Sequence, residues 1–318
     1  MTLTVADRAA AETTVVDRAT APGTAGRVPA QRALPRRWLS ASSVGLVPFL
    51  IFIVVFLGVP VGGIVLSSLR IADVNEPGSY LFSLENFASS FRGASWAAMQ
   101  NSLQISAIAA LTGGLIGLAL AQAILTTRSK KITAVVTVLT SVLANSGGVP
   151  LAFSFIAAVG NAGIVTGLLS LTDFGFTLYS SGGLILMYQY FLIPTMVMVV
   201  LPTLAGLRTQ WKEAAASCGA PRWYFWKRVG LPIASPAILG GFVLLFGASF
   251  ATHASAAALI GAGGVPLITL RIDSGLAGGN LAGQEHIAMA LGVNMIVVAV
   301  LVLLIYMPLQ KRSLKWVK

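Results

Sequence analysis

The chain has 318 residues, of which 56% are hydrophobic and only 10% are charged, and its formal net charge is +11. So little polar surface excludes an ordinary soluble globule and indicates a protein that lies in a membrane. A positive charge of this size is also typical of nucleic-acid-binding proteins. Here, however, the Lys and Arg residues flank long apolar stretches, so we expect contact with membrane lipid and no nucleic acid.

The N-terminal region is rich in Ala, Thr, Arg and Pro and has no sustained apolar period. We expect residues 1–43 to form a disordered basic tail on the cytoplasmic side. We do not expect a cleavable signal peptide, because the first apolar run begins near Val44, is too long for a signal core and is not followed by a small-residue cleavage site.

Six stretches contain no Asp, Glu, Lys or Arg and reach the roughly 20 residues that a helix needs to cross a bilayer. We place the spans near residues 44–69, 99–126, 132–158, 183–207, 236–260 and 287–309. The predicted fold is therefore an all-α polytopic membrane protein, with six transmembrane helices in a domain that covers residues 44–318.

The third charge-free stretch, from Ile132 to Thr172, has room for two spans separated by residues 145–150. A seventh span would place the basic cluster Arg208–Arg228 outside, whereas six spans place it inside together with both termini, as the positive-inside rule requires. We therefore interpret Asn145–Pro150 as a break in or near span three. It should face protein or water, because irregular backbone in lipid leaves amides unpaired.

The segment between spans four and five, residues 208–233, has the composition of a docking surface for another protein. Glu213 is its only acid, and Ala214, Ala215 and Ala216 follow at once. We expect a short helix with Glu213 in its first turn, where the helix dipole favours a carboxylate. The alanines would let a partner approach closely, and Gly219 would end the helix in the left-handed conformation.

This spacing resembles the EAA loop in the permeases of ATP-binding-cassette (ABC) importers, in which Glu-Ala-Ala, a Gly and a final Leu-Pro recur on the cytoplasmic side. The matching residues are Glu213, Ala214, Ala215, Gly219, Val229 in place of the usual Ile, Leu231 and Pro232. The stretch Asn145–Gly163 is similar to the branch that includes the spermidine/putrescine, ferric-iron, sulfate and thiamine permeases.

The resemblance implies a type I importer fold and a transport subunit in the plasma (inner) membrane of a prokaryote. It implies three partners: a cytoplasmic ABC ATPase dimer, a second permease subunit, and an extracytoplasmic substrate-binding protein. The chain contains no Gly-rich phosphate-binding loop, so ATP hydrolysis would belong to the separate ATPase. The solute would be small and polar, with a polyamine favoured over ferric iron, thiamine, phosphonate and organic anions.

The spans contain no Asp, Glu, Lys or Arg, which disfavours a proton-coupled carrier. His253, Ser249, Asn145 and Gln189 are our candidates to line a solute pathway, with helix-to-helix hydrogen bonding as the alternative. If Ser249 and His253 lie on one helix, four residues apart, they share a face. Glycines on span two (Gly113, Gly114, Gly117) and on span five (Gly240, Gly241, Gly247) should allow close helix packing.

Other functional classes explain less of the sequence. The two His and one Cys have no metal-ligand spacing and form no catalytic set, so we expect no metal, no cofactor and no enzymatic activity. A secondary carrier or channel that is not driven by ATP remains the alternative. That class explains the spans but leaves the segment 208–233 without a role.

Overall fold

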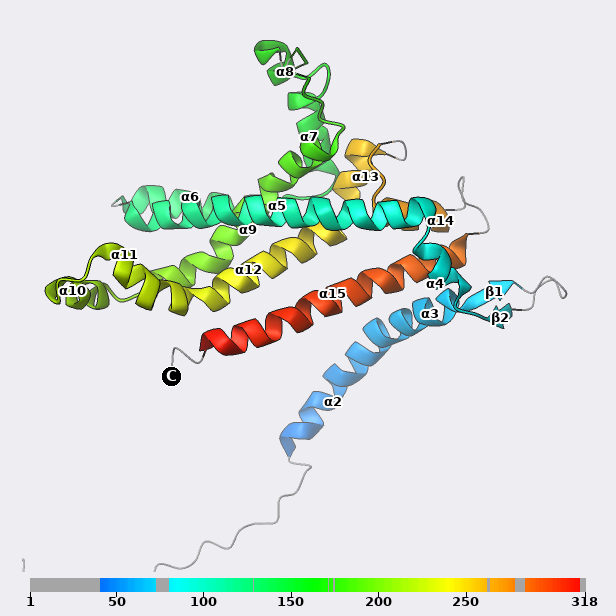
Figure 1. The fold of residues 1–318 in the computed structure, drawn as a ribbon, viewed down its shortest axis with the longest axis horizontal. Helices are drawn as coiled ribbons and strands as arrows, with labels where there is room; N and C mark the ends of the chain where they lie inside the picture. The colour runs from blue at the N-terminus through cyan, green and yellow to red at the C-terminus, as the bar shows by residue number, and fades with distance from the viewer. Residues whose placement is uncertain are drawn as a thin grey trace, which may run out of the picture. The chain divides into compact units, whose positions relative to one another are not determined.

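The computed structural model describes residues 41–72, 80–127, 129–170, 172–173, 175–261, 264–277 and 284–314. The described chain is helical apart from one small sheet (Figure 1). It divides into two compact units, Met1–Ile53 and Val54–Lys318. The first contributes one described helix, α2 (Ala41–Ile53), and residues 1–40 of the predicted tail lie outside the described residues.

The second unit contains all the other elements. It opens with the π-helix η1 (Val54–Gly58), α3 (Val59–Ser68), the antiparallel strands β1 (Arg70–Ala72) and β2 (Tyr80–Phe82), and α4 (Glu85–Ser90). It continues with α5 (Gly93–Thr126), α6 (Lys130–Ala144), α7 (Val149–Val159), α8 (Ile164–Leu169) and α9 (Ser181–Ala205). It ends with α10 (Thr209–Ser217), α11 (Arg222–Phe225), the π-helix η2 (Trp226–Gly230), α12 (Leu231–Ala251), α13 (Ala254–Ile260), α14 (Ile268–Leu276) and α15 (Glu285–Leu314).

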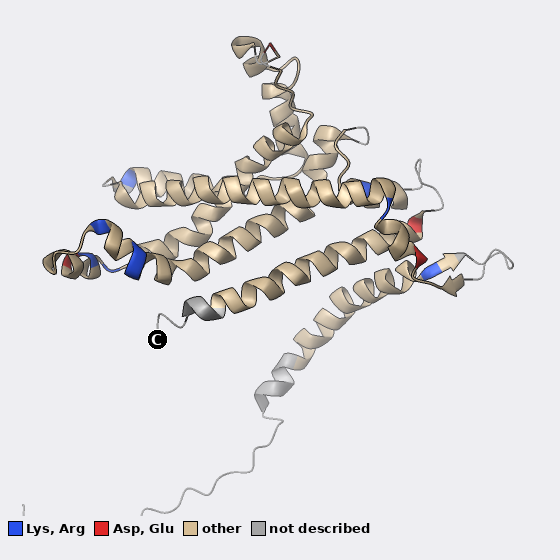
Figure 2. Ribbon diagram, in the orientation of Figure 1, with Lys and Arg blue, Asp and Glu red and all other residues tan. Residues whose placement is uncertain are grey.

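Six helical stretches of the described chain are long and apolar enough to cross a membrane, as predicted. They are Val47–Ser68, Gly93–Thr126, Val149–Leu169, Ser181–Ala205, Arg222–Ala251 and Glu285–Gln310. In the second unit, charged residues lie at helix ends and in the connections, and the long helices are uncharged along their middles (Figure 2). The uncharged middles match an apolar slab with two polar surfaces.

The core of the second unit lies where α5, α9 and α12 pack together. Gly113 and Gly117 of α5 face α9, and a Cβ at Gly117 would lie 2.6 Å from the Cβ of Met196. A Cβ at Gly114 would overlap the Phe242 ring of α12, and one at Gly241 would lie 2.5 Å from Met196 Sδ. The predicted close packing is therefore confirmed at these glycines, because only a missing side chain leaves room for the neighbouring helix.

The two other predicted packing glycines differ from each other. A Cβ at Gly240 would lie 2.8 Å from the hydroxyl oxygen of Tyr306 on α15, so a side chain there would require the Tyr306 hydroxyl to shift. Gly247 was predicted to pack closely, and this is wrong, since no atom lies within 4 Å of its Cβ position.

Buried and half-buried polar side chains link the helices by hydrogen bonds. The Nε2 of Gln189 on α9 donates to the Ala109 carbonyl at 3.3 Å and to Thr112 Oγ1 at 3.0 Å, both on α5. Asn294 Nδ2 on α15 donates to Ser90 Oγ on α4 at 2.8 Å. Such bonds stabilise helix association where no water competes for the donors.

The predicted third span is divided into separate helices. α6 ends at Ala144, Gly148 has φ +88°, and α7 begins at Val149, so the predicted break at residues 145–150 is confirmed. The stretch that meets the length of a span is Val149–Leu169, not residues 132–158, and Lys131–Ala144 is a shorter apolar helix. The physical reason is that α6 already ends at Ala144, and Gly148, with its positive φ, redirects the chain directly before α7.

Ser255 of α13 satisfies the backbone at this break. Its hydroxyl accepts a hydrogen bond from the Gly148 N–H at 2.9 Å and donates one to the Gly148 carbonyl at 3.0 Å. Both polar groups of the redirected residue are thus paired within the protein, as the apolar surroundings demand.

Span five begins and ends earlier than predicted. Helical structure runs from Arg222 to Ala251, since Pro232 lies in the first turn of α12 and Pro236 is accommodated inside it. Thr252 is extended and ends the helix, and α13 follows. The predicted span 236–260 therefore joins parts of two helices, and the first part of the observed stretch Arg222–Ala251 was assigned to the preceding loop.

We expect Gly117→Val to destabilise the α5–α9 contact, because the new Cβ meets both Met196 Cβ and the Ile193 carbonyl. Overpacking of this kind typically costs ~1–3 kcal/mol. Thermal unfolding of the detergent-solubilised chain measures the effect. Gly63→Ala is the matched control, because no atom lies within 4 Å of the Cβ position at Gly63 on α3. Equal melting temperatures for both variants would contradict the packing account.

Candidate functional site

The segment from α10 to α12 places the EAA-like residues on an exposed helix and its corner. α10 contains Glu213, Ala214 and Ala215, and none of its nine residues is buried. Helices this short are marginal in water unless they pack on something. An exposed, alanine-rich helix at the end of a membrane domain is therefore well suited to contact another protein.

Gly219 ends α10 as predicted, in the left-handed conformation with φ +72°. The Gly219 N–H donates to the Ala216 carbonyl and the Ala220 N–H donates to the Ala215 carbonyl, both at 2.9 Å. These two bonds form a Schellman motif, which satisfies carbonyls that the helix end leaves free. Pro221 is extended and α11 starts at the next residue, which completes the predicted corner.

Glu213 was predicted to lie in the first helical turn, and this is wrong. α10 starts at Thr209, directly after the extended Arg208, so Glu213 is its fifth residue and gains little from the dipole at the N-terminus. Its side chain is exposed, and no ion pair joins it to another residue in the described part of the chain. The carboxylate is thus available to a partner.

The remaining motif residues lie at the base of span five. Val229 is half-buried within η2, Leu231 is exposed as the first residue of α12, and Pro232 follows it. Pro232 has no N–H to donate, and it is accommodated in the first turn of α12, at the junction with η2. The two parts of the motif therefore lie on the two helical arms that meet at the corner Gly219–Pro221.

A cavity of about 400 Å³ lies between α10 and the neighbouring helices. Its lining combines the charged residues Lys212, Glu213 and Arg222 with Gln122 of α5 and with Phe225 and Trp226. Three cations lie over aromatic rings in this region at 5.8 Å from the ring centres, namely Lys212 over Trp226, Lys227 over Trp223 and Arg228 over Tyr224. A mixture of basic and aromatic side chains is typical of a membrane–water interface.

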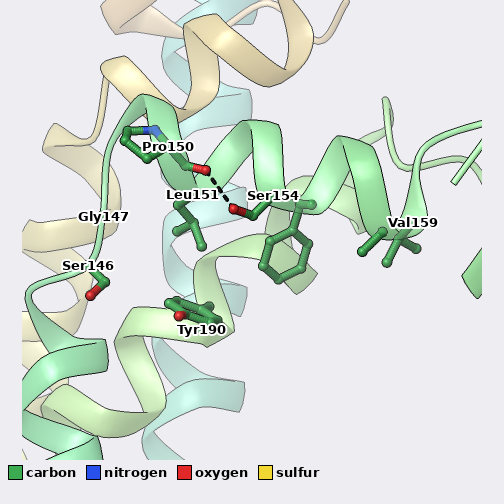
Figure 3. Close-up of a pocket in the computed structure, with 9 residues that line it drawn as sticks. Ser146, Gly147, Pro150, Leu151, Ser154, Val159 and Tyr190 are labelled. Atoms are coloured by element: carbon green, nitrogen blue, oxygen red, sulfur yellow. Dashed lines mark hydrogen bonds between the residues drawn. The ribbon is translucent and has the colours of Figure 1, made fainter. Parts of the chain in front are cut away.

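A second cavity, of about 570 Å³, lies beside the break between α6 and α7 (Figure 3). Ser146, Ser154 and Tyr190 bring hydroxyl groups to its lining, and Phe155 meets the Tyr190 ring edge-on with 6.0 Å between centroids. The Ser154 hydroxyl donates to the Pro150 carbonyl at 2.9 Å. The lining of this neutral cavity contains no charged side chain and is mostly apolar, with the three hydroxyl groups as its polar side-chain atoms.

The four predicted pathway residues do not converge on this cavity. Gln189 and Ser249 hydrogen-bond between helices, since the Ser249 hydroxyl contacts the Ser106 carbonyl of α5 at 3.4 Å. Asn145 is exposed at the end of α6, and its Nδ2 donates to the Ser141 carbonyl at 2.9 Å. These contacts favour the packing alternative for Gln189 and Ser249.

His253 was predicted to share a helical face with Ser249, and this is wrong, because α12 ends at Ala251. The imidazole lies at the turn before α13, and its Nε2 is 4.0 Å from Asp273 Oδ1 of α14, with 39% and 61% of the two side chains exposed. It thus lies at the end of span five, next to a carboxylate.

Sequence reasoning missed the residues that line the neutral cavity, although it placed the break that forms it. Tyr190 follows the predicted Gln189, and Ser146 follows the predicted Asn145. Phe155 and Tyr190 come from different helices, so no spacing in the sequence could have joined them. Within the described residues, no cluster of His, Cys, Asp and Glu is suited to hold a metal ion.

No protein family and no curated protein sequence matches the chain. Among solved structures, it is similar to a chain of a bacterial ABC transporter involved in the import of the acidic polysaccharide alginate. The identity is 20% and the TM-score 0.65, over 86% of this chain and 95% of that chain. The bacterial alginate ABC transporter in complex with a periplasmic protein that carries an alginate pentasaccharide gives 21% identity and a TM-score of 0.65, over 87% and 95%.

The inward-facing MetNI methionine ABC transporter is a more distant neighbour, with 15% identity and a TM-score of 0.53 over 69% of this chain and 96% of that chain. At such identities the likeness concerns the fold. It agrees with the six apolar helices and with the architecture that the EAA-like pattern implied. The chain therefore has the fold of the membrane-spanning permease chains of ABC importers.

Proposed function

We propose that this chain is the transmembrane permease subunit of an ABC importer, located in the inner membrane of a prokaryote. The observation that carries the proposal is α10, a helix with no buried residue that presents Glu-Ala-Ala and ends at a left-handed Gly219. The fold shared with permease chains of known importers supports it. The solute would move through the membrane domain while a separate ATPase supplies the energy.

In this proposal α10 is the surface on which the cytoplasmic ATPase dimer acts. The small side chains of Ala214 and Ala216 let a groove on the partner reach the helix backbone. Glu213 offers one exposed carboxylate among basic neighbours, so it would select a partner that presents a cation. The two hydrogen bonds of the Schellman motif at Gly219 keep the C-terminal end of α10 helical while the ATPase binds to it.

Two further partners belong to the proposal. A second permease subunit, identical or different, would complete the pathway, and an extracytoplasmic binding protein would deliver the solute. The solved alginate transporter was crystallised with such a periplasmic protein. Because that class of partner selects the solute, the membrane domain needs only a permissive path.

The neutral cavity at the helix break is the part of the described chain that we assign to this path. Its hydroxyl groups and aromatic rings offer weak contacts, and its lining holds no carboxylate that would trap a cation. A small polar solute fits such a surface, with a polyamine as the working candidate. Gln189, Ser249, Asn145 and His253 stay candidates of second rank, since all four have the protein contacts described above.

The proposed orientation has a direct test. With Cys218→Ser as background, a Cys at Gln210 on α10 should be labelled by an impermeant maleimide only from the cytoplasmic side, because the basic clusters flank this end of the spans. Leu276→Cys on the exposed end of α14 is the control and should be labelled from outside. Labelling of position 210 in intact cells would show that α10 lies outside and would contradict the proposed orientation.

Coupling is tested by Glu213→Lys, which places a cation where the partner is expected to carry one. We expect ATP-dependent uptake and co-purification of the ATPase to fall about tenfold or more, as for a lost interfacial charge pair. Gly219→Pro should have the same effect, because Pro cannot adopt φ +72° and lacks the donor to Ala216.

The matched control is Gln210→Lys, which adds a charge to the same exposed helix outside the motif. Normal uptake in both motif variants would refute the assignment of α10. Uptake that persists without ATP in the unmodified protein would instead favour a secondary carrier or channel.

The path through the neutral cavity is tested by Gly147→Leu, which fills it. Gly147 lines the cavity and has no atom within 4 Å of its Cβ position, so the new side chain occupies open space. We expect the maximal uptake rate to fall severalfold while the ATPase still co-purifies. Gly167→Leu on α8 is equally unhindered and lies outside the cavity lining, so it should transport normally. Equal uptake by the two variants would place the path elsewhere.

A further inference from the structure

The junction between α10 and α12 contains a buried glycine that the EAA-like pattern does not include. Gly230 has φ −64°, a conformation that any residue adopts, so backbone freedom does not explain it. A Cβ at this position would lie 2.5 Å from Cε3 and 3.0 Å from Cζ3 of Trp226. The glycine is required by space, because the indole ring lies directly against its backbone.

The Trp226 ring is held on the α12 side of the junction. Trp226 is the first residue of the π-helical turn η2, which ends at Gly230. The Phe225 ring meets the Trp226 ring nearly edge-on, with 6.1 Å between the ring centroids and 77° between the ring planes. Phe225 is buried, and Trp226 also packs against the main hydrophobic core. Short π-helical turns are rare and occur frequently at functional sites.

The same ring also contacts α10. Lys212 Nζ lies 5.8 Å from the centre of the Trp226 ring, which is within the range of a cation–π interaction. Since α10 buries none of its own residues, this interaction has unusual weight in setting its orientation. The contacts thus run in series from α10 through Lys212 and Trp226 to Gly230 at the base of span five.

We propose that Lys212, Trp226 and Gly230 form a clamp that fixes the orientation of α10 relative to α12, so that a force applied to α10 moves span five. The inference rests on the proposed function, because only a partner on α10 would apply such a force. The three residues contact neither solute nor nucleotide in this account and act as positioning residues. The clamp adds a second connection to the covalent one through Gly219 and Pro221.

The clamp is tested on the full chain in lipid nanodiscs by pulsed electron paramagnetic resonance. With Cys218→Ser as background, spin labels are attached to Cys residues introduced at Gln210 on α10 and at the exposed Leu244 on α12. The unmodified clamp should give one narrow distance distribution. Gly230→Ala displaces the indole ring and should broaden that distribution, as should Trp226→Leu.

The contribution of the Lys212 charge to the clamp is tested separately. Lys212→Met keeps the aliphatic stem and loses the cation, which should raise the population of displaced α10 about two- to fivefold, as for an exposed cation–π interaction. Lys212→Arg keeps a cation over the ring and should restore the narrow distribution. The effects of Gly230→Ala and Trp226→Leu should not add in the double variant, because both remove the same contact.

Gly247→Ala is the matched control, since it changes a glycine on the same helix with no atom within 4 Å of its Cβ position. It should leave the distance distribution unchanged. An unchanged distribution in both Gly230→Ala and Trp226→Leu would overturn the clamp, whatever partner binds.

In the complex with an ATPase, Gly230→Ala should lower the uptake per ATP hydrolysed while the ATPase stays bound, and an unchanged ratio would overturn the coupling role. Failure of any ATPase to bind the unmodified chain would contradict the proposed function instead.

Discussion

The structure depends on the requirement that every backbone polar group inside an apolar environment be hydrogen-bonded within the protein. Long helices meet this requirement over most of the described chain. At the break between α6 and α7, the hydroxyl of Ser255 pairs with both the N–H and the carbonyl of Gly148. Ser255 itself belongs to α13, which follows the end of α12. Two helix interruptions that lie far apart in the sequence thus support each other, and the neutral cavity lies next to them.

The same constraint explains why the interior and the exposed end of this unit are built differently. In the interior, α5, α9 and α12 approach so closely that glycines replace side chains, and Gln189 bonds across the contact. At the exposed end, α10 has no buried residue, and its carboxylate has no ion-pair partner among the described residues. A rigid interior joined to an uncovered helix is the arrangement expected of a domain that another protein moves.

Much of this could be predicted from the sequence because it depends on local chemistry. Charge-free stretches identified the spans, Gly219 identified the end of α10, and residues 145–150 identified the break. The position of Glu213 was predicted wrongly because Arg208 precedes the helix with no capping side chain, so nothing marks Thr209 as the first residue. Span five was placed too late because Pro232 and Pro236 were taken as breaks, although α12 accommodates Pro232 in its first turn and Pro236 in its interior.

Other features depend on contacts that no sequence pattern contains. Ser249 and His253 would share a face if the helix continued, but extended Thr252 separates them. The neutral cavity is lined by Phe155 and Tyr190, which come from different helices. The Trp226 ring occupies the space where a side chain at Gly230 would lie, and both residues belong to the π-helical turn η2. These are consequences of packing, which sets distances between residues that local propensity leaves open.

The central claim is that α10 contacts a separate ATPase, and the chain carries a natural probe for it. Cys218 is its only cysteine and is exposed at the end of α10. A photoactivatable crosslinker attached to Cys218 in inside-out membrane vesicles, followed by mass spectrometry, identifies what lies against the helix. The account predicts crosslinked peptides from a subunit that contains a phosphate-binding loop, and loss of ATP-dependent uptake after crosslinking. Crosslinks confined to lipid or to this chain itself, with uptake unaffected, would contradict it.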